Sequence, residues 1–269
     1  VINARKAPAE KLQMWRDKMA SLYTAGAFDL LPGQNTGFAV TDNEPVMLFD
    51  GEGAGITVLG NITLRDRLRF RTGESHARID GIGITGADHG GAIFVNAYAT
   101  GLEISNNRLI ANQGWFGGGI RVGHPTLVSE DPVLGSVYTD ADNDRLDIHH
   151  NHVAQNGNLG GAGGGISLYT GANQYNVSSN FICGNFSAGS GGGIGHLGLS
   201  WWSRIADNKI LFNQSFNQLQ SVSGGGIYIG GQAGLGTAPS PGAGHVTIDG
   251  NLIQGNQAGA GDGGGIRTE

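Results

Sequence analysis

Residues 176–194, NVSSNFICGNFSAGSGGGI, contain the pattern that decides the fold of this chain. The aliphatic residue Val177 precedes Asn180 by three positions, and Ile182 precedes Asn185 in the same way. Three glycines and an isoleucine complete the unit. A unit with two or three short apolar segments cannot bury its apolar side chains alone, so it must pack against neighbouring copies of itself.

The same unit occurs five times along the chain. Its asparagine pairs are Asn107/Asn112, Asn151/Asn156, Asn180/Asn185, Asn208/Asn213 and Asn251/Asn256, and its closing isoleucines are Ile120, Ile166, Ile194, Ile227 and Ile266. Gly90-Gly91-Ala92-Ile93 is a near copy of the glycine motif. Successive first asparagines are 44, 29, 28 and 43 residues apart, which indicates a unit near 28 residues with two long insertions. Both insertions fall between a glycine–isoleucine segment and the next asparagine, so we expect them along one edge of the stack.

These residue types predict an all-β solenoid in which coils stack roughly 4.8 Å apart. Asparagine bends the chain, tolerates the left-handed region, and can hydrogen-bond through its side chain to the equivalent asparagine of the next coil. The glycine triplets allow positive-φ corners and close approach of backbones. We therefore interpret both motifs as scaffold.

Composition restricts the classes of partner. The chain has 269 residues, 50 of them glycine, and a formal net charge of −6. Clustered Lys and Arg are not found, so a nucleic-acid partner is not expected. Cys183 is the only cysteine and forms no disulfide within the chain. No apolar run approaches the roughly 18 residues that span a bilayer, so no membrane span is expected.

The N-terminal part differs from the repeats. Residues 7–24 have helical spacing of Leu12, Trp15, Met19 and Leu22, which predicts an amphipathic helix. We expect residues 1–45 to form a helix and capping segment that covers one end of the stack, and residues 46–269 to form the solenoid. A linker helix from a preceding domain is the alternative. The strand that opens at Ile266 has no capping element after it, so further coils of the parent chain are expected.

The paired motifs resemble the right-handed parallel β-helix group, the pectin-lyase-like superfamily, over roughly residues 46–269. The Ile-x-x-Asn and Gly-Gly-Gly-Ile segments are also similar to the repeats of polymorphic outer-membrane proteins. The resemblance implies a right-handed parallel β-helix and an extracellular or cell-surface location. Because this superfamily is implied to include lyases, hydrolases, epimerases, tailspikes and adhesin passengers, it does not choose a function.

A groove along the inserted edge is the first candidate site. The edges between the two insertions carry Tyr169 and Tyr175 on one coil and Trp201 and Trp202 on the next. Aromatic faces suit sugar rings, because they offer apolar area with little entropy to lose. These residues are predicted to bind polysaccharide. In the alternative, one tryptophan fills the core and the other lies against an insertion.

The first insertion is rich in acidic residues, with Glu130, Asp131 and then Asp140, Asp142 and Asp144. Alternating carboxylates can converge on calcium. The pattern departs from an EF-hand loop, because Arg145 stands where glycine is required. A solvated acidic loop is the favoured interpretation, and no cofactor is expected.

Three groups of histidines are weaker candidates. His149, His150 and His152 precede and follow a ladder asparagine, where other coils have variable residues, so we expect them to be exposed. His196 falls in an inward column, and we expect the strand to bend there so that Leu197 fills the core. Asp88 and His89 form either an acid–histidine pair for carbohydrate chemistry or a turn capped by the aspartate, which is favoured.

Two functions are compatible with these sequence features. The favoured one is a surface scaffold without catalysis that binds polysaccharide or displays loops in the manner of an adhesin. The alternative is a polysaccharide lyase, glycoside hydrolase or epimerase that uses Asp140, Asp142, Arg121 and His124 on the inserted edge, with Asp88 and His89 as further candidates. Two carboxylates roughly 5 to 10 Å apart beside the tryptophans would favour the enzyme.

Overall fold

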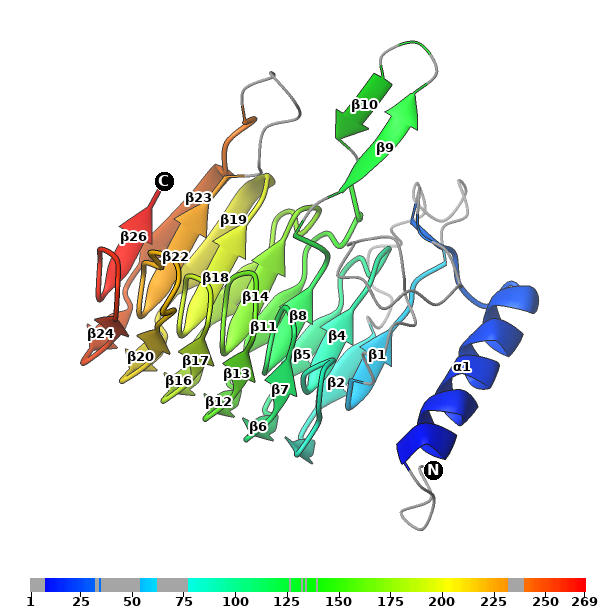
Figure 1. Cartoon of the computed structure of the whole chain (residues 1–269), viewed down its shortest axis with the longest axis horizontal. Coiled ribbons are helices and arrows are strands. Elements are labelled where there is room, and N and C mark those ends of the chain that lie inside the picture. The colour runs from blue at the N-terminus through cyan, green and yellow to red at the C-terminus, as the bar shows by residue number, and fades with distance from the viewer. Residues whose placement is uncertain are drawn as a thin grey trace.

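The computed structural model describes residues 8–31, 34, 54–61, 77–125, 127–131, 133, 135–138, 140–231 and 240–269. The described part is predominantly β, with its strands in stacked parallel sheets and one helix, α1 (Pro8–Thr24), beside the N-terminal end of the stack (Figure 1). The predicted boundary between residues 45 and 46 lies outside the described residues.

The described strands form four parallel sheets, which we call sheets I to IV. Sheet I contains β1 (Ile56–Val58), β4 (Ile93–Val95), β8 (Ile120–Val122), β14 (Ile166–Tyr169), β18 (Ile194–Leu197), β22 (Ile227–Gly230) and β26 (Ile266–Thr268). Sheet II contains β2 (Arg78–Asp80), β5 (Glu103–Ser105), β11 (Asp147–His149), β15 (Asn176–Ser178), β19 (Ser200–Ala206) and β23 (Gly244–Asp249).

The other two sheets are built from shorter strands. Sheet III contains β3 (Gly83–Thr85), β6 (Arg108–Ile110), β12 (His152–Ala154), β16 (Phe181–Cys183), β20 (Lys209–Leu211) and β24 (Leu252–Gln254). Sheet IV contains β7 (Gln113–Gly114), β13 (Gly157–Asn158), β17 (Phe186–Ser187), β21 (Gln214–Ser215) and β25 (Gln257–Ala258). An antiparallel pair, β9 (Val128–Asp131) and β10 (Gly135–Tyr138), stands apart from these sheets.

The chain passes through the sheets in a fixed order. From β11 it continues through β12, β13 and β14, and then enters β15, which pairs with β11 in sheet II (Figure 1). Ile148 pairs with Ile104 on one side and with Val177 on the other, so equivalent residues of adjacent coils are aligned. Each circuit therefore adds one strand to every sheet, and the predicted register of the repeats is confirmed.

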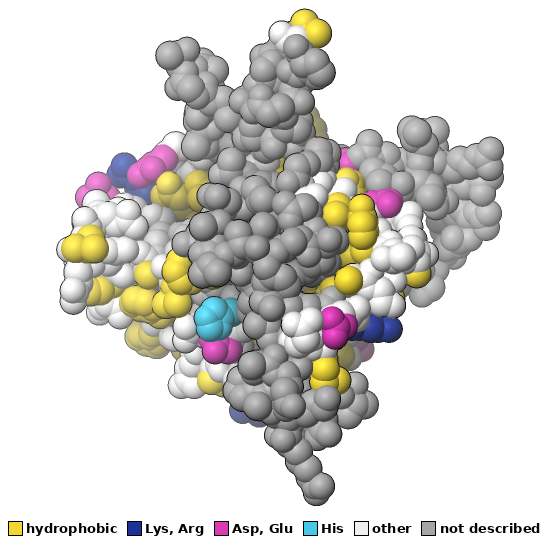
Figure 2. Space-filling model, turned by 45° about the vertical axis from the view of Figure 1, so that its right-hand side comes forward, with side chains coloured by type: hydrophobic (Ala, Val, Ile, Leu, Met, Phe, Trp, Pro, Cys, Tyr) yellow, Lys and Arg dark blue, Asp and Glu magenta, His cyan; other side chains and the backbone are white. Residues whose placement is uncertain are grey.

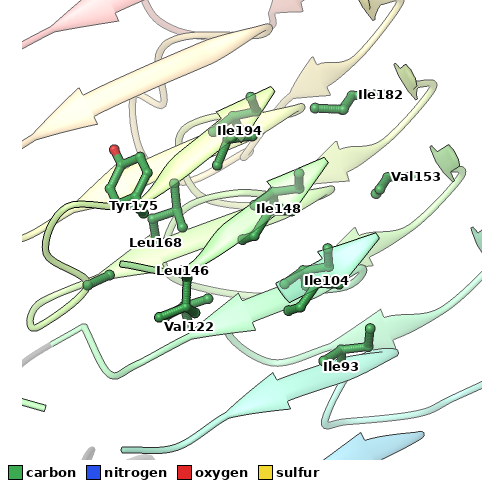
Figure 3. Close-up of a cluster of buried hydrophobic side chains, with 14 of the residues drawn as sticks. Ile93, Ile104, Val122, Leu146, Ile148, Val153, Leu168, Tyr175, Ile182 and Ile194 are labelled. Atoms are coloured by element: carbon green, nitrogen blue, oxygen red, sulfur yellow. The ribbon is translucent and has the colours of Figure 1, made fainter. Parts of the chain in front are cut away.

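The interior is filled by the aliphatic residues of the repeat. Side chains alternate across a strand, so Ile104, Ile148 and Ile194 point into the stack while their neighbours point outward. All three are fully buried and lie in one hydrophobic cluster that runs through the coils (Figure 3). Burial in this continuous file is what stabilises units that have no core of their own.

Two ladders of asparagine side chains run along the stack, as predicted. In the first, Nδ2 of Asn180 donates to Oδ1 of Asn208 at 3.0 Å and to the carbonyl oxygen of Ile148 at 2.8 Å. The same oxygen of Asn208 also accepts from the backbone N–H of Asn180. The second ladder repeats this geometry through Asn112, Asn156, Asn185, Asn213 and Asn256. Each buried amide is thereby satisfied by its neighbours.

The left-handed backbone conformation falls on the residue before each ladder asparagine rather than on the asparagine itself. Ser179 has a φ of 56° and Gln155 a φ of 55°, whereas Asn180 and Asn156, which follow them, are not in this region. The tolerance of asparagine for the left-handed region is therefore not used at these positions. The asparagine instead points inward, where its side chain reaches the next coil.

The glycine triplets bring adjacent coils close together. A Cβ atom on Gly192 would lie 2.5 Å from the backbone carbonyl carbon of Gln214 and 2.5 Å from the carbonyl oxygen of Gly225. The first glycine of this triplet, Gly191, has a φ of 72°. Both predicted uses of glycine, close approach and a positive-φ corner, are present in one motif.

Helix α1 packs against the first strands of sheet I. Met19 forms a buried cluster with Phe28 and Phe94, and Trp15 and Leu22 are partly buried against it. Phe94 points outward from β4, since Ile93 and Val95 on either side of it belong to the interior cluster. The predicted helix is confirmed, and Trp15, Met19 and Leu22 of its apolar stripe pack on the outer surface of the sheet.

Candidate functional site

The insertions leave the stack at the same edge. The first follows β8 and contains the β9–β10 pair, and the second follows β22, so both lie between sheet I and sheet II. Figure 1 shows the β9–β10 pair projecting away from the sheets on this side. The expectation of a single inserted edge is confirmed, although residues 232–239 of the second insertion lie outside the described residues.

A β-bulge presents two tryptophans on this edge. Ser200 pairs with Gly244 and Ser203 pairs with Val246, so Trp201 and Trp202 oppose one residue of the neighbouring strand. Trp202 has a φ of 57°, a strained conformation for a bulky side chain. The two tryptophans are 50% and 67% exposed, so the alternative in which one of them fills the core is wrong.

The two tyrosines predicted to accompany the tryptophans are buried. Tyr175 belongs to the interior cluster, and Tyr169 is fully enclosed with its hydroxyl hydrogen-bonded to the backbone of Ala162. Neither ring is accessible to a ligand outside the stack. The predicted ligand-binding role of Tyr169 and Tyr175 is therefore corrected, and the aromatic surface consists of Trp201 and Trp202.

Hydrogen bonds connect the tryptophan bulge to the acidic insertion. The backbone N–H of Trp201 donates to Oδ1 of Asn173 at 3.1 Å. The Nδ2 of the same asparagine donates to Asp140 at 3.0 Å and to Asp144 at 3.2 Å. Trp202 stacks on His245, with ring centroids 4.6 Å apart. One amide thus holds two carboxylates beside the bulge, a link that sequence spacing did not reveal.

Arg121 and His124 lie inside the protein rather than on the edge. Both are about 1% exposed, and Nη2 of Arg121 donates to Nδ1 of His124 at 3.2 Å. The Nε2 of His124 donates to Oδ1 of Asn96 at 2.7 Å, and Arg121 lies over the Phe94 ring. Because a substrate outside the stack cannot contact them, their predicted catalytic role is wrong.

The described carboxylates of the acidic insertion take part in hydrogen bonds within the protein. Oδ1 of Asp140 accepts the backbone N–H of Asp142, and Asp144 accepts from Asn173. Nowhere among the described residues do three or more His, Cys, Asp or Glu side chains converge as metal ligands would. Calcium at Asp140, Asp142 and Asp144 stays an untested prediction.

Among the weaker candidates, His89, His150 and His152 are exposed, as expected, and His149 is half-buried. His149 contacts His150 through their Nδ1 atoms at 2.8 Å and Glu103 through Nε2 at 3.1 Å. Nδ1 of His89 lies 3.1 Å from Oδ1 of Asp88, and the same carboxylate accepts the backbone N–H of His89. With a φ of 64° at His89, this pair is a turn capped by an aspartate.

His196 lies in the inward column in which the repeat pattern places it, and the expectation that the strand bends there is wrong. It is fully buried and pairs with Leu168 and Ile229 in sheet I, so the strand does not bend to bring Leu197 inward. Its ring is hydrogen-bonded to the hydroxyl of Tyr175 and to the carbonyl oxygens of Gly198 and Ala243. Its place in an apolar column was the signal that could have found it.

Few charges gather on the described surface. On the face drawn in Figure 2, basic and acidic side chains occur in small groups among apolar ones. The only described helix, α1, is too short and too polar to cross a membrane.

The chain matches no family model, and comparisons with curated proteins and with solved structures find no match either.

Proposed function

We propose that this chain is a right-handed parallel β-helix at the cell surface or outside the cell, and that its inserted edge binds polysaccharide through Trp201 and Trp202. The closed circuit through four parallel sheets and the two asparagine ladders support the fold. Parallel strands joined by a crossover are right-handed in nearly all proteins, which supports the hand. Helix α1, packed on the outer surface of sheet I beside the N-terminal end of the stack, is proposed to shield that end.

The observation that carries the binding function is the tryptophan bulge. Indole rings are large and apolar, so leaving two adjacent ones half or more exposed forgoes stabilisation that burial would give. The left-handed backbone of Trp202 adds further strain. Bulges re-aim side chains and are frequent beside functional sites. The exposed rings and the strained backbone both cost stability at the same bulge, and we infer that the rings serve recognition.

The groups around the bulge suit a sugar chain. A pyranose ring presents an apolar face that stacks on indole and a rim of hydroxyl groups that hydrogen-bond. Near Trp201, the exposed Gln174 side chain offers an amide donor and the Asp140 carboxylate offers acceptors for such a rim, while the Asn173 amide holds these groups in place. The long edge between the two insertions lets a polymer lie across several coils.

The test is binding of the purified chain to a panel of neutral, acidic and amino-sugar polysaccharides, measured by calorimetry and affinity electrophoresis. The Trp201→Ala/Trp202→Ala double variant should lose binding. Phe212→Ala is the matched control, because Phe212 is also an exposed aromatic residue but lies on the turn between sheets III and IV. Equal binding by the double variant and the parent chain, or no binding to any polysaccharide, contradicts the proposal.

One observation favours a second candidate, a carbohydrate-active enzyme. Asp140 and Asp144 contact the same amide nitrogen of Asn173, so their carboxylates are close enough for the roughly 5 to 10 Å spacing of glycosidase pairs. We propose this pair, without Arg121 and His124, as the catalytic set of that alternative. Release of reducing ends or unsaturated products, abolished by Asp140→Asn and by Asp144→Asn, would select it over binding alone.

A further inference from the structure

A buried histidine, His196, is hydrogen-bonded to the segments that adjoin the tryptophan bulge. His196 lies in the column of sheet I that Leu168 and Ile229 occupy in the adjacent coils, so its ring is inside the stack. A polar side chain in such a column needs hydrogen-bond partners to offset the loss of water. His196 finds its partners in segments that adjoin the bulge.

The protonation pattern of the ring follows from these partners. Nε2 lies 2.8 Å from the carbonyl oxygen of Gly198 and 3.2 Å from that of Ala243, and carbonyls only accept, so Nε2 carries a proton. In the neutral ring Nδ1 is then an acceptor, and the hydroxyl of Tyr175 donates to it at 3.0 Å. The neutral ring satisfies every polar atom in the group.

The same three segments hold the bulge. The carbonyl oxygen of Ala243, which His196 contacts, also accepts the backbone N–H of Ser200 at 3.1 Å. The backbone N–H of Tyr175 donates to the hydroxyl of Ser203 at 3.3 Å, and the Ser200 and Ser203 hydroxyls are 2.8 Å apart. Ser200 and Ser203 are the two residues between which the register shifts to expose the tryptophans.

A charge on this ring would be offset only in part, by the carbonyl oxygens of Gly198 and Ala243. Tyr175 is the titratable group that faces it, while Leu168 and Ile229 face it from β14 and β22. Residues 232–239, QAGLGTAP, which come soon after β22 in the chain, contain no charged side chain. When Nδ1 gains a proton it becomes a donor, so the hydrogen of the Tyr175 hydroxyl has to rotate away and needs another acceptor inside the stack. Burial accordingly lowers the pKa of His196 to about 4.

We propose that neutral His196 holds the Trp201–Trp202 bulge in its exposed geometry, and that acid releases the bulge by charging this ring while the rest of the stack stays folded. His196 is in this sense a positioning residue. The role of this release in regulating binding rests on the proposed function. The release itself can be measured without any ligand.

The experiment is ¹⁹F NMR of the chain labelled with 5-fluorotryptophan, titrated from pH 7.5 to 3.5. The four resonances, from Trp15, Trp115, Trp201 and Trp202, are assigned by single Trp→Phe substitutions. The Trp201 resonance should move with a midpoint well below pH 6.5, together with the imidazole signals of His196 in a long-range ¹H–¹⁵N spectrum. The Trp15 and Trp115 resonances and the far-ultraviolet circular dichroism should stay constant over that step.

Variants separate this mechanism from general acid effects. In the His196→Leu/Tyr175→Phe double variant, which restores an apolar column, the Trp201 transition should disappear. His196→Gln, which remains neutral and can still hydrogen-bond, should also abolish it. His245→Gln is needed as a background, since His245 stacks on Trp202 and can move its resonance independently. His152→Leu, a change at an exposed histidine on sheet III, should leave the transition intact.

Three results would overturn the inference: a Trp201 resonance that does not respond when His196 is protonated, a transition that persists in the double variant, or global unfolding as the first event. The affinity for a polysaccharide should be weaker in acid than at pH 7. The expected loss is about tenfold for each unit by which the bound polysaccharide lowers the pKa of His196. A chain that shows the transition but binds no polysaccharide contradicts the proposed function and leaves the acid release standing.

Discussion

The hydroxyl of Tyr175 donates a hydrogen bond to Nδ1 of His196 at 3.0 Å, and both side chains are completely buried among aliphatic residues. Burial raises the pKa of Tyr175 and lowers that of His196 from 6.5 to about 4, although the carbonyls of Gly198 and Ala243 oppose part of the latter change. Both groups are therefore neutral at pH 7. This pair makes the stability of the protein depend on pH.

The first prediction concerns acid stability. The unfolded chain binds a proton on this histidine near pH 6.5, whereas the folded chain does so only near pH 4. The contribution of His196 is fully present above pH 6.5 and is lost as the pH falls toward 4. The free energy of unfolding should decrease by about 3 kcal/mol over this interval. Urea titrations at several pH values measure it.

The control for acid stability is the His196→Leu/Tyr175→Phe double variant. Between pH 6.5 and 4, the free energy of unfolding of this variant should fall by about 3 kcal/mol less than that of the parent chain. The reason is that the variant lacks both the His196 imidazole and the Tyr175 hydroxyl. Equal pH dependence in the parent and the double variant would assign the acid sensitivity to other groups.

A second prediction concerns the asparagine ladder. Asn180→Ala removes the acceptor for the backbone and side-chain N–H groups of Asn151 and the donor to the carbonyl of Ile148. Buried polar groups left unpaired should lower the free energy of unfolding by about 2 to 5 kcal/mol. Asn176→Ala, on the outer face of the same coil, should cost less than about 1 kcal/mol. Chemical denaturation compares the two, and similar costs would refute a structural ladder.

A third prediction concerns the glycine triplet. Gly192→Ala places a methyl group 2.5 Å from backbone atoms of Gln214 and Gly225, which no side-chain movement can relieve. We expect a loss of at least about 2 kcal/mol in the free energy of unfolding. Gly83→Ala is the matched control, because its Cβ would meet no atom within 4 Å, and it should be neutral or slightly stabilising. A neutral Gly192→Ala variant would show that the coils can separate locally.

A fourth prediction concerns affinity at the bulge. Trp201→Ala and Trp202→Ala should each weaken polysaccharide binding about tenfold or more, which corresponds to the loss of roughly 1.4 kcal/mol of stacking energy. Since both rings are exposed, the melting temperature should change little. Calorimetry and thermal denaturation on the same samples check both statements. A large loss of stability with unchanged affinity would assign the tryptophans to the scaffold.

A fifth prediction separates backbone strain from side-chain loss. Trp202 has a φ of 57°, whereas Trp201 is not in the left-handed region. At position 202 the glycine variant should therefore be more stable than the alanine variant, by about 1 kcal/mol. At position 201 the order should reverse, because glycine there only adds entropy to the unfolded chain. The same order at both positions would contradict the strained bulge.

The local pattern of the repeat was sufficient to predict most of the scaffold. The spacing of Val177, Asn180, Ile182 and Asn185 fixes which side chains face inward, because strand alternation and the requirement for hydrogen bonds leave few alternatives. It did not predict that Ser179 takes the left-handed turn. The residue at that position differs from copy to copy, as Gln155, Asp207 and Phe212 show, so no single residue type marks it.

The candidate site was predicted less well, because its residues depend on contacts between coils. Trp201 and Trp202 were named correctly as an exposed aromatic pair, whereas Tyr169 and Tyr175 are buried despite lying on the same edge in the sequence. Arg121 and His124 were expected on the surface and are enclosed beside Phe94. Whether an edge residue is covered depends on the path of the insertions, which repeat spacing does not specify.

The sequence by itself determined the repeat, the register of its coils and the position of the two asparagine ladders, since each follows from short-range spacing that recurs five times. Only the tertiary structure decided that His196 points inward and that the segment after it bulges to expose two tryptophans. These features depend on residues as far apart as Tyr175, His196 and Ala243, whose hydrogen bonds exist only when the coils are stacked.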